Sequence, residues 1–418
     1  MSGRPSIAFW FRYGPAEHAE LFHAMPEIWA ELARHCTVHC FGMRTEKPIP
    51  ENILRTVEWH PLPLRVRRNS GLSKLAKTAL WVAALPYVAR RCRALGVRAV
   101  YIDETIPLTA GIALRHFGPR VAVTVADMFT DIYFTGALAP IGRLLQRADI
   151  RAWRRLPLIF TRARNTRDWL AERGVAPEAV HPVYDPCDFG LYHPPSPADR
   201  AAARAAFGYG PGDIVLAHHG IAHPNKGNDR ILRWLAPLLP EHPGLRFLLV
   251  GDGPELPCLR RLAEELGIAR ACTFTGWLPG PADVCRALGA ADIGLVMRTG
   301  ARSDDFHMTG ALVHSMACGL PVLAARLGGV AEVVEDGRNG YLFPPDDGPA
   351  FQTALLKLAA DSAPRARLGA AAHADARRHF DLPGVVRATV GPLLALAGAN
   401  NNIIKHIYLP PYSIKIIS

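Results

Sequence analysis

The stretch "LRFLLVGDGPELPCLRRLAEELGI", residues 245–268, decides the fold class. It opens with an apolar run that ends at a Gly-Asp-Gly turn, which is typical of a buried strand. The residues after the turn, "ELPCLRRLAEELGI", predict a helix. A buried strand that leads at once into a helix is the repeating unit of a parallel sheet covered by helices.

The same alternation runs through the whole chain. Between residues 213 and 340 it predicts a series of strands and helices, and the part before residue 183 repeats the pattern with strands such as "SIAFWF", "CTVHCFG", "RVAVTV" and "LIFTRA". Two such series predict an α/β protein with two Rossmann-like, doubly wound domains that face each other across a cleft. Ligands of such sheets bind beyond the carboxyl ends of the strands, so we expect the site in the loops that follow strands.

The domain boundaries follow from changes in composition. The turn-rich, proline-rich stretch 183–200 interrupts the alternation, so we place an N-terminal domain at 1–185 and a second domain at 186–382. A C-terminal helix is expected over 383–399. Residues 400–418 change abruptly to Asn, Ile, Lys and Tyr, and we interpret them as an atypical, non-native tail.

The composition narrows the class of protein. The chain has 418 residues, of which 49% are hydrophobic and 20% are charged, as in globular proteins of two domains. Its eight cysteines show no CxxC spacing and no disulfide framework, and the N-terminus has no signal-peptide pattern, so we expect a cytoplasmic protein. "HCTVHC" is open to a metal-binding interpretation, but a buried strand is favoured there.

Much of the net charge of +11 comes from one segment. Residues 59–102 contain nine Lys or Arg and no Asp or Glu, around an uncharged run that is too short to span a bilayer. This segment predicts either a helix that docks on an anionic membrane surface or a core helix with a basic rim. No aromatic residues interleave with the basic ones as nucleic-acid binding requires. The membrane-facing candidates are Arg65, Arg67, Arg68, Lys74, Lys77 and Trp81.

One loop carries an anion-binding pattern. In "HHGIAHPNKGNDRIL", Gly220 and Gly227 bracket Lys226 just before a predicted helix. A lysine beside the free N–H groups of a helix N-terminus favours a phosphate. After the next strand, Gly251 begins a turn that lets backbone approach a ligand or another loop.

The stretch "DDFHMTGALVHSMACGLPVLAA", residues 304–325, extends this pattern. A polar loop leads into a helix of small residues that starts near Gly310, which would let a diphosphate or ribose lie against backbone donors. Tight packing of the helix on its sheet would also require small residues, so both interpretations stay open.

Together with "FLLVGDGPEL", "CTFTGWLP", "AADIGLVM" and "GGVAEVVEDGRNGYLFPPDD", these motifs resemble the C-terminal half of GT-B glycosyltransferases of the glycosyltransferase family 4 kind. The resemblance is specific over about residues 213–381. It implies a retaining transferase that moves a sugar from a nucleoside-diphosphate sugar to a glycan or lipid-linked acceptor, as in bacterial surface or exopolysaccharide synthesis. It also implies that Lys226 and helix N-termini stabilise the leaving diphosphate without a metal or other cofactor. By this resemblance the first domain, 1–185, would bind the acceptor and the second domain, 186–382, the nucleotide sugar. Gly14 would face the phosphates from the first domain.

The chain departs from the family pattern at several positions. Two family glutamates, which bind sugar hydroxyls and the donor ribose, fall on Phe306 and His314, so Asp305, His307 or Thr309 would take over the sugar contacts. A neutral histidine still offers a ribose hydroxyl a donor or an acceptor. The family arginine that precedes the lysine is missing.

Asp127, just past a strand, is expected to bind the acceptor or the transferred sugar, or else to cap a turn. The departures leave two rival functions open, a catalytically silent GT-B partner protein and a nucleotide-sugar epimerase. A dehydrogenase is disfavoured because neither domain opens with GxGxxG after its first strand.

Overall fold

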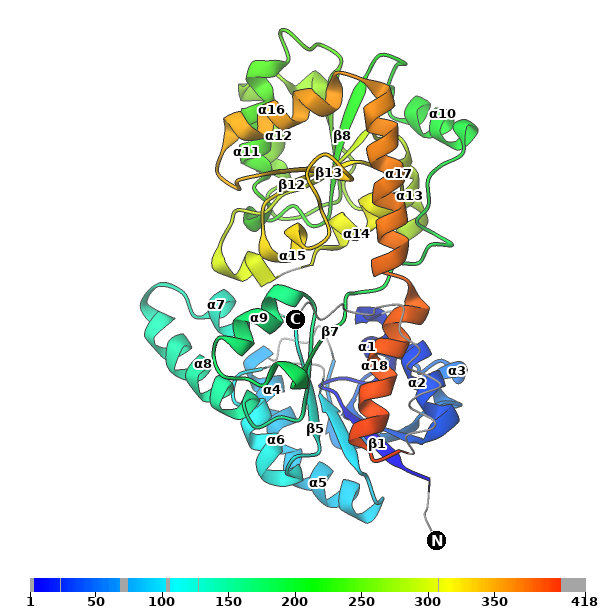
Figure 1. Cartoon of the computed structure of the whole chain (residues 1–418), viewed down its shortest axis with the longest axis vertical. Helices are drawn as coiled ribbons and strands as arrows, with labels where there is room; N and C mark the ends of the chain where they lie inside the picture. Colours follow the sequence, from blue (N-terminus) through cyan, green and yellow to red (C-terminus); the bar gives the residue numbers. More distant parts are fainter. Residues whose placement is uncertain are drawn as a thin grey trace, which may run out of the picture. The chain divides into compact units, whose positions relative to one another are not determined.

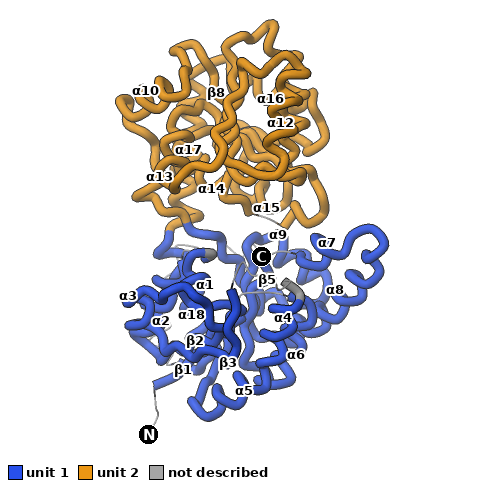
Figure 2. Tube along the Cα trace, turned by 180° about the vertical axis from the view of Figure 1, so that it is seen from behind, with its two compact units in different colours: residues 1–186, 382–418 blue, residues 187–381 orange. Residues whose placement is uncertain are grey.

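The computed structural model describes residues 4–22, 24–67, 74–102, 106–126, 128–306 and 308–399. The chain divides into two compact units, Met1–Pro186 with Leu382–Ser418, and Cys187–Asp381 (Figure 2). Asp127, His307, Arg68 and the tail 400–418 lie outside the described residues, as does the side chain of Lys74.

The first unit is built on one parallel sheet of seven strands in the order β3-β2-β1-β4-β5-β6-β7 (Figure 1). Its strands are β1 (Ser6–Trp10), β2 (Thr37–Arg44), β3 (Glu58–Arg65), β4 (Ala99–Ile102), β5 (Val121–Val125), β6 (Leu158–Thr161) and β7 (Val180–Pro182). Its α-helices are α1 (Pro15–Leu21), α2 (Met25–His35), α3 (Glu51–Leu54), α4 (Lys74–Ala83), α5 (Leu85–Ala94), α6 (Thr109–Phe117), α7 (Phe129–Tyr133), α8 (Ala139–Trp153), α9 (Arg164–Ala171) and α18 (Leu382–Leu396). Short 3₁₀ turns lie at η1 (Gly136–Leu138) and η2 (Pro177–Ala179).

Strand β1 shows why this sheet is covered on both faces. All five of its residues are buried, and successive side chains point to opposite sides of the sheet. Phe9 meets Trp29 of α2 edge to face at 6.1 Å, whereas Trp10 stacks on Trp81 of α4 at 4.1 Å. Helices therefore pack against both faces, as the apolar strand predicts.

The second unit repeats the architecture with six parallel strands in the order β10-β9-β8-β11-β12-β13. The strands are β8 (Ile214–His219), β9 (Leu245–Val250), β10 (Cys272–Phe274), β11 (Ile293–Val296), β12 (Val322–Ala325) and β13 (Gly340–Phe343). The helices are α10 (Pro197–Ala206), α11 (Asn228–Leu235), α12 (Leu256–Glu265), α13 (Pro281–Gly289), α14 (Gly310–Ala317), α15 (Gly328–Ala331), α16 (Gly348–Ala359) and α17 (Ser362–His379), with 3₁₀ turns η3 (Pro224–Lys226), η4 (Ala236–Leu238), η5 (Ala269–Ala271) and η6 (Arg302–Phe306). The predicted strand and helix within 245–268 are β9 and α12.

The C-terminal helix α18 belongs to the first unit, although the second unit separates the two in sequence. Helix α18 packs beside α2 (Figure 1). Val390, Leu393 and Leu394 of α18 are buried in the same core as Ile28 and Trp29 of α2. The sequence alone predicts this helix as a separate element, because a periodic apolar pattern does not specify the surface that the helix covers.

The structure corrects the expectation that Lys77 and Trp81 face a membrane. Lys77 is 2% exposed and donates a hydrogen bond to the carbonyl of Arg67, and Trp81 is fully buried against Trp10. The face of α4 that was assigned to the membrane therefore packs on the sheet, because its tryptophan fills the space over β1. Arg65 and Arg67 are exposed. Among the described residues, no helix combines the length and the apolar character needed to cross a bilayer.

Candidate active site

The second unit has its topological switch point between β8 and β11. The strand order reverses direction there, since β9 and β10 lie on one side of β8 and the later strands lie on the other. Such a point leaves a crevice at the carboxyl ends of the two central strands. The loops after β8 and β11 are joined by a hydrogen bond from the Thr299 amide to the Asn225 carbonyl at 3.0 Å.

Lys226 lies in the loop after β8. It ends the turn η3, and Gly227 follows in the left-handed conformation at φ 60°, directly before α11. The side chain is half-buried. Burial, together with the charge of Arg298, lowers the pKa of Lys226 from its ordinary value to about 8, while Asp304 opposes the shift. A partly desolvated lysine beside a helix N-terminus binds an anion more strongly than one in water.

Arg298 follows β11 and is a second cation at this point, which the sequence analysis missed. It is 9% exposed and forms an ion pair with buried Asp304 at 3.0 Å. Asp304 also accepts the amide of Ala301 at 3.1 Å, so the pair is held in place. The signal in the sequence was a basic residue directly after the apolar run "DIGLVM", but the proximity of β11 to β8 is visible only in the fold.

Two buried histidines, His218 and His219, end β8 beside these cations. Burial lowers the pKa of His218 and of His219 to about 3, and the nearby Lys226 lowers both further. Both rings are therefore neutral at physiological pH. Neither ring nitrogen of His218 has a hydrogen-bond partner among the described residues.

His314 of α14 is held between rings. It stacks on Tyr192 at 3.8 Å with the planes 5° apart, and its Nδ1 lies 3.2 Å from Nε2 of His219. His314 is only partly buried, although its neighbours in α14 are buried. The structure thus fixes the orientation of the imidazole that the sequence assigned to the ribose.

The polar loop before α14 is partly structural. Thr309 is 2% exposed, and its hydroxyl caps α14 by accepting the amide of Leu312 at 3.2 Å. Asp305 is exposed, and its Oδ1 accepts the amide of Gly328 at 2.8 Å. Phe306 is buried, so it packs in the core. Gly310 is exposed at the start of α14.

The glycines after β8 and β9 meet each other. A Cβ on Gly251, whose φ is 141°, would lie 2.1 Å from the carbonyl oxygen of Gly220. The amide of Gly220 donates to the carbonyl of Val250 at 3.0 Å. The Gly-Asp-Gly turn was expected to let backbone approach either a ligand or another loop. The structure shows the close approach of another loop, the one that follows β8.

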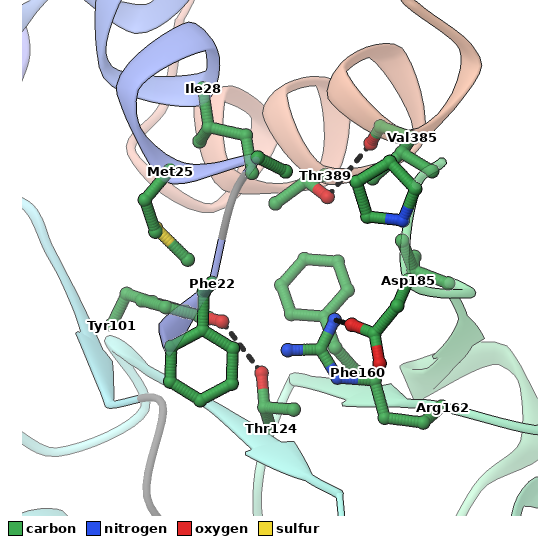
Figure 3. Close-up of a pocket in the computed structure, with 13 residues that line it drawn as sticks. Phe22, Met25, Ile28, Tyr101, Thr124, Phe160, Arg162, Asp185, Val385 and Thr389 are labelled. Carbon is green, nitrogen blue, oxygen red and sulfur yellow. Dashed lines mark hydrogen bonds and ion pairs between the residues drawn. The ribbon is translucent and has the colours of Figure 1, made fainter. Parts of the chain in front are cut away.

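In the first unit, Gly14 is the N-cap of the short helix α1, and a Cβ there would lie 2.9 Å from Oε2 of buried Glu17. A separate small pocket lies at the carboxyl ends of β4, β5 and β6 (Figure 3). Arg162 and Asp185 form an ion pair in it at 2.9 Å, opposite Phe22 and Met25. Its volume of about 30 Å³ holds about two water molecules rather than a sugar ring.

The two parallel sheets with their helices define a GT-B fold, as expected. Solved structures with this architecture include HepE of Anabaena in complex with UDP, which is 20% identical, with coverage of 93% of this chain and 100% of that one and a TM-score of 0.70. Sucrose-phosphate synthase from Thermosynechococcus elongatus is 18% identical, with coverage of 92% and 96% and a TM-score of 0.66.

Sequence relatives identify the family. Residues 213–361 match the family described as Glycosyl transferases group 1. The chain is 33% identical over 347 residues to a GDP-mannose-dependent alpha-(1-6)-phosphatidylinositol monomannoside mannosyltransferase of Mycolicibacterium smegmatis, covering 75% of this chain and 87% of that protein. It is 37% identical over 214 residues to a D-inositol 3-phosphate glycosyltransferase of Saccharomonospora viridis, covering 49% and 47%. The chain belongs to the group 1 glycosyl transferases and is a glycosyltransferase.

Proposed function

We propose that this glycosyltransferase moves a sugar, with retention of configuration, from a nucleoside-diphosphate sugar to a glycan or lipid-linked acceptor. The observation that carries the proposal is the cluster at the switch point of the second unit, formed by the cations Lys226 and Arg298 beside the neutral rings of His218 and His219. Two cations and a helix N-terminus at the carboxyl ends of central strands suit a diphosphate. The relative named as GDP-mannose-dependent and the fold relative crystallised with UDP support this class of donor.

The cluster suggests how the leaving group is stabilised. Lys226 and Arg298 would meet the negative charge that develops on the diphosphate as its bond to the anomeric carbon breaks. The departing phosphate oxygen would take the proton of the acceptor hydroxyl while the new glycosidic bond forms on the same face. Because Asp304 holds Arg298 in place, the cation needs little reorganisation during the reaction. We propose that these side chains act in place of a metal.

The remaining donor contacts follow from the loop around α14. His314, oriented by Tyr192 and His219, would bond a ribose hydroxyl. The exposed residues Asp305 and Gly310 would lie nearer the sugar than Thr309, whose hydroxyl already caps the helix. His307, Asp127 and Gly14 keep their expected roles toward the sugar, the acceptor and the phosphates as part of this proposal.

A turnover assay tests the proposed function. GDP-mannose and UDP-glucose are each incubated with the protein, with and without a bacterial lipid extract, and released nucleoside diphosphate and the anomeric configuration of the product are measured. We expect acceptor-dependent release from one donor and a product of unchanged configuration. Isomerisation of the donor alone would establish the epimerase instead, and a folded protein inactive with both donors would favour the silent partner.

The membrane contact is better placed on α7, η1 and α8 than on α4. Five exposed apolar side chains gather along these elements, and residues 132–148 contain no Asp or Glu. Arg143 and Arg147 of α8 are exposed among them. Apolar side chains with flanking arginines suit the interface of an anionic bilayer, where a cytoplasmic enzyme would meet a lipid-linked acceptor. The five are Ile132, Tyr133, Leu138, Ile141 and Leu144.

Co-sedimentation with vesicles tests this placement. We expect binding to vesicles of phosphatidylcholine with phosphatidylglycerol, weak binding to phosphatidylcholine alone, and loss of binding when Ile141 and Leu144 are both changed to Asp. Leu54→Asp is the matched control, because Leu54 is similarly exposed, at 49%, on α3. Binding that ignores anionic lipid, or that survives the double change, would contradict the placement.

A further inference from the structure

Three side chains with metal-ligating atoms converge on β2 and β3 of the first unit. They are His39, Glu58 and His60, and one ligand atom of each lies within 4.8 Å of the other two. Nδ1 of His39 is 3.1 Å from Nε2 of His60 and 3.1 Å from Oε2 of Glu58, and the third distance, from Nε2 of His60 to Oε2 of Glu58, is 3.9 Å. Within the described part of the chain this is the one group of three or more such residues.

The parallel register of the two strands brings the three together. His39 of β2 pairs with Glu58 of β3, and Phe41 pairs with His60 two positions along. Residues two apart on a strand point to the same face, so all three lie on one side of the sheet. The ring of His60 stacks on Phe41 at 4.7 Å with the planes 17° apart. The backbone pairing and this stack therefore fix the cluster.

The distances between the three ligand atoms are close to those around a tetrahedrally coordinated ion. Zinc binds histidine nitrogen at about 2.0–2.1 Å and carboxylate oxygen at about 2.0–2.2 Å, so two ligand atoms of a tetrahedral site lie roughly 3.3 Å apart. Two of the three observed distances are 3.1 Å and the third is 3.9 Å. A shift of the Glu58 carboxylate by a few tenths of an ångström would complete the geometry. Two histidines and a glutamate, with water in the fourth position, form a known zinc ligand set.

The surroundings of the cluster leave it open to a cation. Burial is the main cause that lowers the pKa of both His39 and His60 from the ordinary histidine value. Glu58 acts in the opposite direction on both rings, and Arg91 of α5 adds to the lowering at His60. The Glu58 side chain is 58% exposed, so an ion can reach the cluster from solvent.

We propose that His39, Glu58 and His60 form a binding site for a divalent transition-metal ion of the zinc class. The site lies toward the amino ends of β2 and β3, because Glu58 begins β3 and His39 is near the start of β2. Ligands of the transfer reaction bind at the opposite, carboxyl ends of such strands. The ion therefore crosslinks the edge strand β3 to β2 and takes no part in sugar transfer.

Metal titration of the full chain, stripped with a chelator, tests the proposal. Calorimetry with ZnCl₂ is expected to show one site, Co²⁺ to give the visible absorption of tetrahedral coordination, and saturating zinc to raise the melting temperature by a few degrees. His60→Ala and Glu58→Gln are each expected to weaken binding at least 100-fold. Glu58→Gln alters an exposed side chain and keeps its size, so it also tests the site if His60→Ala fails to fold.

Two control variants separate this site from other ligands. His35→Ala removes a histidine that already lies 3.3 Å from a carboxylate oxygen of Glu31, and Cys258→Ser removes an exposed thiol. Neither is expected to alter zinc affinity or the cobalt spectrum. Absence of zinc binding to the stripped, folded chain in the calorimetric titration would overturn the proposal. Binding that Glu58→Gln leaves unchanged would overturn it too.

Discussion

Lys226 is the residue on which the proposed chemistry depends most. Removal of one preorganised charged contact to a leaving group typically costs about 2.7–4 kcal/mol, or roughly 100- to 1,000-fold in turnover. We expect Lys226→Ala to fall in this range in a steady-state assay. The variant should fold normally, since burial disfavours the charged lysine in the wild type. Lys357→Ala, which removes a lysine over the ring of Tyr341, serves as the control and should keep full turnover.

The pH dependence of donor affinity gives a second prediction. The pKa of Lys226 is lowered to about 8 in the free protein, so above this pH the lysine is neutral and a diphosphate must recruit a proton to bind. Affinity should therefore fall by up to about tenfold per pH unit as the pH rises above 8. In Lys226→Arg the guanidinium stays charged, and this fall should disappear. Calorimetry at pH 7 to 9.5 measures the nucleotide affinity of both proteins. An affinity of the wild type that does not change with pH would contradict the role of Lys226 at the diphosphate.

Variants of the ion pair between Arg298 and Asp304 should affect the stability of the fold and the affinity for nucleotide differently. Arg298→Met leaves a buried carboxylate without its partner, which typically costs about 3–5 kcal/mol in the free energy of unfolding. The double change Arg298→Met with Asp304→Leu should recover most of that stability in urea unfolding. Nucleotide affinity should stay low in both variants. Recovery of nucleotide affinity in the double variant would mean that Arg298 serves only to offset the negative charge of Asp304.

At this scale the sequence predicts some residues and misses others for a physical reason. Lys226 was identifiable because its partner, the N-terminus of α11, is adjacent in the chain. Arg298 was not, because it meets Lys226 only through the packing of β11 beside β8. Lys77 and Trp81 were wrongly assigned to a membrane surface, because the sequence of a helix with a basic and an apolar face does not show which face is buried.

At the scale of elements, the loops after β8 and β9 must touch for the site to form. Gly251→Ala would place a Cβ 2.1 Å from the carbonyl oxygen of Gly220, at a φ of 141° that other residues avoid. Such strain costs about 1–3 kcal/mol, and the clash adds to it, so we expect a lower urea midpoint for the second unit. Gly212→Ala, where the Cβ meets open space, is the control. Equal stability of the two variants would contradict the close approach.

Sequence patterns predicted individual strands and helices better than they predicted single site residues. Short apolar runs between helical stretches predicted the strands and the parallel sheets, because a strand buried on both faces consists mainly of apolar residues. The same patterns gave no partner for α18 and did not predict the edge strand β3. The contacts of α18 join segments far apart in the chain, and a periodic pattern describes only one of the two surfaces in contact.

At the scale of the whole molecule, two sheets of the same design carry different chemistry. The second unit concentrates cations at its switch point and matches the family over residues 213–361. The first unit carries the small pocket, the apolar face of α7 and α8, and the cluster on β2 and β3. This division agrees with the proposed function, in which the second unit binds the donor. The central claim of that proposal is a diphosphate site at Lys226.

The most direct test is thermal unfolding with UDP, GDP, ADP and TDP at one common concentration, each once with EDTA and once with magnesium. One nucleotide should raise the melting temperature by a few degrees under both conditions, since a ligand at 100 times its dissociation constant adds roughly 2.7 kcal/mol. The shift should vanish in Lys226→Ala and persist in Lys357→Ala. No shift with any nucleotide in the folded protein, or a shift that requires magnesium, would contradict a metal-independent diphosphate site at Lys226.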